Sequence, residues 1–228
     1  MRLSFMIVRV QQFPVQDAET FGGWPDVGLI SGIAYEWGDE TGAFEIVIAE
    51  QDESGRPLSG RLRRDHLRSV IPTLAQALQQ PGGTLIARLD GPCAPGELLG
   101  ALQHLPACEA SGRFALSPVQ KLDASPGACF GSLRMEMDFQ RLEMLCSDPG
   151  LNLETSVRLR LFGIAEEAAE AVLVTDETSD ERWGENLAQT SFIIQPARGM
   201  EAIQVITPRF GASEFSARVT RALAGTVD

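Results

Sequence analysis

Strict alternation of apolar and polar side chains over residues 133–140 is the feature that most constrains this chain. Apolar residues occupy the odd positions, and charged or polar residues occupy the even positions. A period of two is typical of a strand with one buried and one exposed face. The alternation resumes over residues 151–161, where Arg158 and Arg160 stand between apolar residues. The two segments therefore predict neighbouring strands of an antiparallel sheet.

A turn between the two segments supports this prediction. Asp148-Pro149-Gly150-Leu151 fits a type II turn, because Pro presets φ at the second position and Gly supplies a positive φ at the third. A hairpin on this turn, with one bulge near Gln140, places Asp138 opposite Arg160. A third β-rich run at residues 171–175 completes an antiparallel meander. The residues expected to be buried are Met137, Phe139, Leu159 and Leu161, and those expected to be exposed or paired are Glu136, Asp138 and Arg160.

Residues outside the meander add helices and further strands. Apolar residues three or four positions apart predict a helix over residues 64–79, with Pro72 inside it, and another that starts at Ser213. Residues 191–195 and 202–207 predict a hairpin. Further strands are expected at residues 2–11, 27–37, 43–50, 84–90 and 113–116, and further helices at residues 96–104 and from residue 178. The expected fold class is α+β, mainly an antiparallel sheet with helices on one face.

The order of these elements suggests two similar α+β halves, although their residues do not repeat. Ser, Pro, Gly and Ala are enriched over residues 106–128, so a boundary is expected there. Residues 1–107 then form an N-terminal α+β half, and residues 108–228 form a C-terminal half that holds the meander and helices. The alternative organisation is one domain that contains both halves. Residues 12–26 are long for a loop, which suggests a packed crossover or a partner-facing lid.

The composition excludes several classes of partner. The formal charge of −12 opposes binding to nucleic acid or to an anionic membrane, since both need clustered cations. No apolar run approaches the roughly 20 residues of a membrane span. Arg9 interrupts the apolar run at the N-terminus and no small-residue cleavage site follows, which indicates a strand rather than a signal peptide. The widely spaced cysteines are expected to be reduced thiols of a soluble cytoplasmic protein.

Motifs for metal and cofactor binding are absent. The chain has no Walker loop, Gly-x-Gly-x-x-Gly, His-Glu-x-x-His, Gly-x-Ser-x-Gly or EF-hand loop. Cys93, His104 and Cys108 offer three ligands, one fewer than a structural zinc site needs. His104 is also suited to the end of a helix, where the dipole favours a cation. We therefore expect neither a metal nor a cofactor.

Cys93 is the strongest candidate for a nucleophile. It precedes the expected helix over residues 96–104, and a helix N-terminus favours the reactive thiolate. Asp90 ends the preceding strand, and His66 or His104 is the available base for a Cys-His-Asp arrangement. The simpler interpretation of Cys93 is a small buried cysteine beside a proline turn.

Arg134, Arg158 and Arg160 lie on the polar face of the expected meander. Guanidinium groups bind carboxylates and phosphates, so these residues are suited to an anionic ligand or partner. They alternate with carboxylates along the strands, however, which favours cross-strand pairing instead. The acidic residues between 166 and 185 lack the spacing of a calcium loop, so a solvated surface is expected there.

The sequence favours a non-enzymatic binding or assembly module with an unidentified protein or small-molecule ligand, because its catalytic groups are few. The first alternative is a cysteine-dependent enzyme that uses Cys93, Asp90 and His66 or His104. The second is a small-molecule sensor with its pocket between the two halves. Convergence of Asp90, Cys93 and a histidine in one pocket would favour the enzyme.

Overall fold

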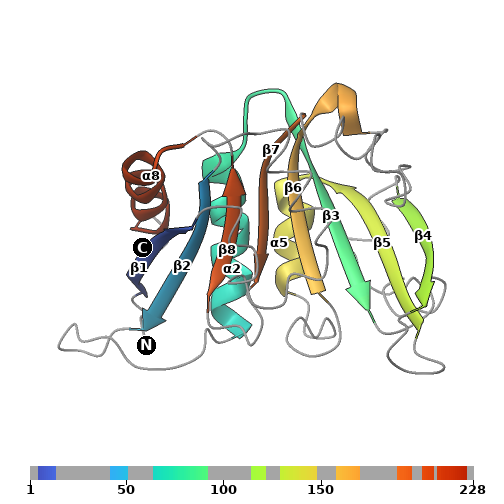
Figure 1. The fold of residues 1–228 in the computed structure, drawn as a ribbon, viewed down its shortest axis with the longest axis horizontal. Helices are drawn as coiled ribbons and strands as arrows, with labels where there is room; N and C mark the ends of the chain where they lie inside the picture. The colour runs from blue at the N-terminus through green and yellow to red at the C-terminus, as the bar shows by residue number, and fades with distance from the viewer. Residues whose placement is uncertain are drawn as a thin grey trace.

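The computed structural model describes residues 5–13, 42–50, 64–91, 114–121, 129–147, 158–169, 189–196, 202–207 and 210–224. These segments are drawn in colour in Figure 1. The strands are β1 (Phe5–Phe13), β2 (Gly42–Glu50), β3 (Gly83–Gly91), β4 (Phe114–Lys121), β5 (Cys129–Met137), β6 (Arg158–Ala165), β7 (Thr190–Pro196) and β8 (Ile203–Thr207). The helices are α2 (Arg64–Leu78), α5 (Phe139–Ser147) and α8 (Ala212–Ala224), with a 3-10 turn η2 (Glu166–Ala168).

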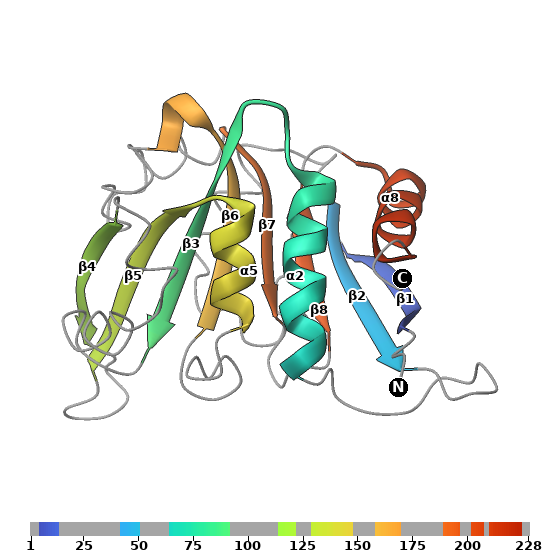
Figure 2. The ribbon, with the colours of Figure 1, turned by 180° about the vertical axis from the view of Figure 1, so that it is seen from behind.

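All the described strands belong to one antiparallel sheet. Their order is β1-β2-β8-β7-β6-β3-β5-β4, and every neighbouring pair is antiparallel. α2 and α5 lie on one face, as the opposite views in Figures 1 and 2 show, and α8 joins them through contacts with α2. This arrangement confirms the expected α+β fold with helices on one face of an antiparallel sheet. β3 lies between β6 and β5, so strands from both halves of the chain share the sheet.

The main core lies between the helices and this face of the sheet. Met137, Leu159 and Leu161 belong to it, which confirms the buried face expected for these positions. Phe44 of β2 stacks on Phe215 of α8 with the ring centroids 3.9 Å apart and an interplanar angle of 10°. Both rings are fully buried, so this pair attaches α8 to the sheet. Other core residues include Leu85, Ala87 and Leu89 of β3, Val70, Ile71, Leu74 and Leu78 of α2, and Val219 and Leu223 of α8.

The expected pairing within the meander is wrong. β5 pairs with β3 and β4, and β6 pairs with β3 and β7, so β5 and β6 are not neighbours. Residues 139–147 form α5 instead of continuing the strand, and Asp138 therefore does not face Arg160. Phe139 is the first residue of α5 and is half-buried against the core. Alternation specifies the face that a residue occupies, but it does not specify which strand lies alongside.

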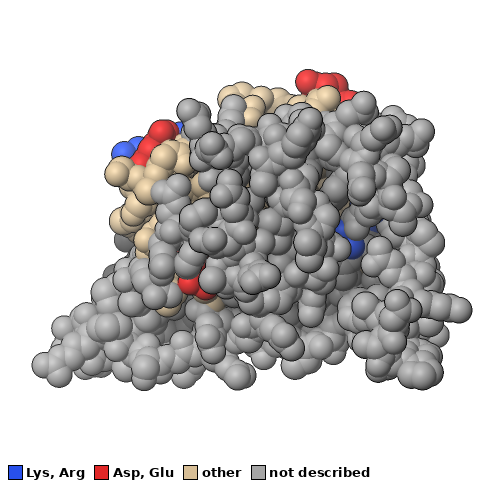
Figure 3. Space-filling view, in the orientation of Figure 1, with Lys and Arg blue, Asp and Glu red and all other residues tan. Residues whose placement is uncertain are grey.

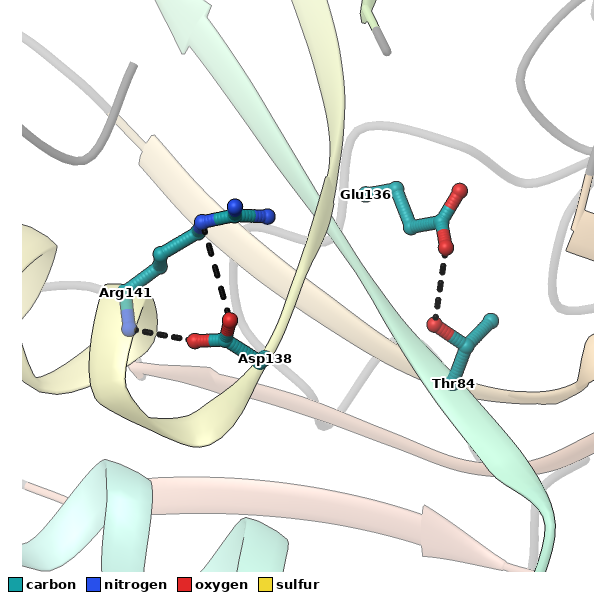
Figure 4. Close-up of polar contacts among 4 residues, drawn as sticks. All are labelled: Thr84, Glu136, Asp138 and Arg141. Atoms are coloured by element: carbon teal, nitrogen blue, oxygen red, sulfur yellow. Dashed lines mark hydrogen bonds and ion pairs between the residues drawn. The ribbon is translucent and has the colours of Figure 1, made fainter. Parts of the chain in front are cut away.

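Asp138 ends the strand because it caps α5. Its Oδ1 accepts a hydrogen bond from the backbone N–H of Arg141 at 2.8 Å, and its backbone carbonyl accepts one from Leu142 at 3.0 Å. This is the geometry of a helix N-cap. The carboxylate also lies 3.6 Å from Nε of Arg141, and both contacts are visible in Figure 4. The buried residues of α5, at helical spacing, are Leu142, Leu145 and Cys146.

A type II turn connects α2 to β3. The backbone N–H of Gly83 donates to the carbonyl of Gln80 at 3.1 Å, and Gly82 has a φ of 73°. Pro81 presets φ before it, as this turn type requires. The reversal makes β3 run opposite to α2, so the start of α2 and the end of β3 lie at the same end of the molecule, as Figure 2 shows.

Most other expected elements within the described residues are confirmed. α2 passes through Pro72 and ends close to residue 79, and β7 pairs with β8 as the expected hairpin. α8 begins at Ala212, so Ser213 lies inside its first turn rather than at its cap. Gln12 and Phe13 belong to β1. The elements expected at 27–37, 96–104, 171–175 and from 178, and the loop residues 14–26, lie outside the described residues.

Gly163 of β6 makes room for a buried ring on the adjacent strand, β7. It lies opposite Phe192, and a Cβ built on Gly163 would lie 2.2 Å from the Phe192 ring. We expect Gly163→Ala to lower the free energy of unfolding by about 1–3 kcal/mol, the usual cost of overpacking. In a Phe192→Ala background the same change should cost under about 0.5 kcal/mol, because the ring is gone. Urea denaturation of the four proteins measures both values, and an equal cost in both backgrounds would contradict this packing.

The cap of α5 gives a second prediction about stability. We expect Asp138→Ala to lower the free energy of unfolding by about 1 kcal/mol, because the amide of Arg141 loses its acceptor. Asp138→Asn keeps a side-chain oxygen that can cap the helix, so its loss should be under about 0.5 kcal/mol. Urea denaturation measures both variants. Equal losses would show that the ion pair with Arg141, rather than the cap, stabilises α5.

Candidate ligand-binding face

A row of polar side chains crosses the sheet on its second face, which is the face opposite α2, α5 and α8. Alternation along β3 puts Leu85, Ala87 and Leu89 in the main core and Arg88 on this second face. From β5 to β2 the row, which we call the polar row, consists of Arg134, Arg88, Arg160, Gln195, Gln204 and Glu45.

Strand register makes the polar row continuous. Arg88 lies opposite Arg134 on one side and opposite Arg160 on the other. Nε of Arg160 donates to Oε1 of Gln195 at 3.4 Å, and Nε2 of Gln195 donates to Oε1 of Gln204 at 2.7 Å. Gln204 in turn lies opposite Glu45. Residues directly opposite in antiparallel strands have Cα atoms roughly 4.5–5.5 Å apart and share a face.

The arginine end of the row is buried. The exposed fractions are 3% for Arg134, 7% for Arg88 and 3% for Arg160. All three also take part in further interactions. Figure 3 views this face and shows a small area of Lys and Arg surface over β3 and β5, surrounded by residues that the structure does not describe.

The neighbouring row on the same face is mostly apolar. Ile86, Phe162, Ile193 and Ile206 lie opposite one another in that order on β3, β6, β7 and β8, and none is more than 3% exposed. On β3 and β6, this face therefore holds buried apolar side chains two residues away from Arg88 and Arg160. At the β5 end of this row lies Glu136, a half-buried carboxylate whose Oε1 accepts a hydrogen bond from Thr84 at 3.5 Å (Figure 4).

Arginine is the commoner charged residue in the three strands at this end. Together β3, β5 and β6 contain four arginines and two carboxylates, Asp90 and Glu136. Buried charges are stable when opposite charges and hydrogen bonds compensate them. Because Arg134, Arg88 and Arg160 are buried, their stability depends on the groups around them.

The structure describes two of the three residues of the expected Cys-His-Asp arrangement. Asp90 lies in β3, opposite Ser132 of β5 and Arg158 of β6, and His66 lies in the first turn of α2. Both positions are at the same end of the molecule, but one belongs to the sheet and the other to the helix layer. Cys93, His104 and Cys108 lie outside the described residues. The Cys93–His66–Asp90 arrangement therefore stays a prediction.

Among the described residues, no group of three or more His, Cys, Asp or Glu residues is placed to hold a metal ion. None of the described helices is long and apolar enough to cross a membrane.

Sequence reasoning found part of the polar row and missed the rest. The sequence predicts Arg134 and Arg160 on a polar face, where cross-strand pairing is favoured over an anionic ligand, and it predicts Arg88 only as part of a strand. The period of two in β3, which puts Ile86, Arg88 and Asp90 on one face, was the available signal. Gln195 and Gln204 carried no such signal, because a glutamine in a hairpin is ordinarily a solvent-facing residue.

Comparison with known proteins was negative in three respects: no protein-family model, no curated protein and no solved structure matches the chain.

Proposed function

We propose that this chain is a binding module and that it binds its ligand on the second face of the sheet, at the arginine end of the polar row. The observation that carries the proposal is the alignment of Arg134, Arg88 and Arg160 on three adjacent strands, each at most 7% exposed. Clusters of like charge in a buried place are costly, and they are common where a site is arranged for a ligand.

The apolar neighbours support a ligand-binding role over a purely structural one. Ile86 and Phe162 occupy the same face of β3 and β6, two residues from the arginines, and are buried there. An apolar residue at position 88 is thus compatible with the local packing, and buried charges are often less stabilising than apolar residues of similar volume.

Replacement of Arg88 tests this proposal. In a ligand site, Arg88→Met removes repulsion between cations, so the free energy of unfolding of the ligand-free protein should stay within about 1 kcal/mol of wild type or rise. In a structural ion network, the same change leaves a buried carboxylate uncompensated and should cost about 3–5 kcal/mol. Urea denaturation distinguishes the two outcomes, and a loss of 3 kcal/mol or more would contradict the proposed binding site.

Arg141→Met is the matched control for this experiment. Arg141 is also an arginine with a nearby carboxylate, but its side chain is 32% exposed and its partner Asp138 is 59% exposed. A surface ion pair contributes about 0–1 kcal/mol, so this variant should change stability little. Arg160→Met should cost about 1 kcal/mol more than Arg88→Met, because Gln195 loses a hydrogen-bond donor.

A cysteine-dependent enzyme is the second candidate, since His66 lies in the first turn of α2 and Asp90 lies near the end of β3. If Cys93 is a nucleophile, it must react as the thiolate with help from a base. For a binding module we expect slow iodoacetamide labelling of Cys93 near neutral pH, with a rate that His66→Ala and His104→Ala leave unchanged. Mass spectrometry of the labelled peptides measures this rate, and the buried Cys146 serves as an internal reference. Rapid labelling that depends on a histidine would favour the enzyme instead.

The proposed setting is the cytoplasm. Cys146 is a buried cysteine that forms no disulfide, which suits a reducing compartment. Nucleic acid is not the proposed ligand, because phosphate backbones are bound by exposed cations and the arginines of the polar row are buried.

A further inference from the structure

We draw no further inference here: the strongest candidate, the outer edge of β4 at the end of the sheet, has β5 as its one strand neighbour among the described residues, and nothing in the structure shows what covers it.

Discussion

The position of β3 between β5 and β6 is the constraint on which the fold and the candidate site both depend. Leu85, Ala87 and Leu89 complete the core beneath the helices, and Arg88 between them completes the row of arginines on the other face. A register shift of one residue would exchange the two sets and bury a guanidinium in the core. The effective penalty for such a buried, uncompensated ion is several kcal/mol. Core packing therefore fixes the register, and the register aligns the arginines.

Local signals in the sequence predicted which helices and strands form better than they predicted which strands lie side by side. Helical spacing identified α2 and α8, and the turn around Pro196 identified the hairpin of β7 and β8. The partner of β5 was missed because the alternation of residues 133–140 is equally compatible with any adjacent strand. α5 was missed because the alternation extends through Phe139, although Asp138 and the spacing of Leu142 and Leu145 already indicated a capped helix.

The candidate site could be predicted only in part, because it exists through pairing between distant segments. Arg134 and Arg160 were recognisable as cations on the polar faces of two strands. Their separation by a third strand, and the presence of Arg88 on that strand, follow from the sheet order and not from any local pattern. For the expected Cys93–His66–Asp90 arrangement, the residue types in the sequence indicate the chemistry. The arrangement itself stays a prediction, because Cys93 lies outside the described residues.

The polar row has consequences for how a bound ligand would act. The strand register brings Arg134, Arg88 and Arg160 together only when the sheet forms. In the proposed site, a ligand bound among them therefore meets a cluster that the folded chain has and the unfolded chain lacks. Ligand binding and folding are then linked, and the free energy of binding adds to the stability of the native sheet.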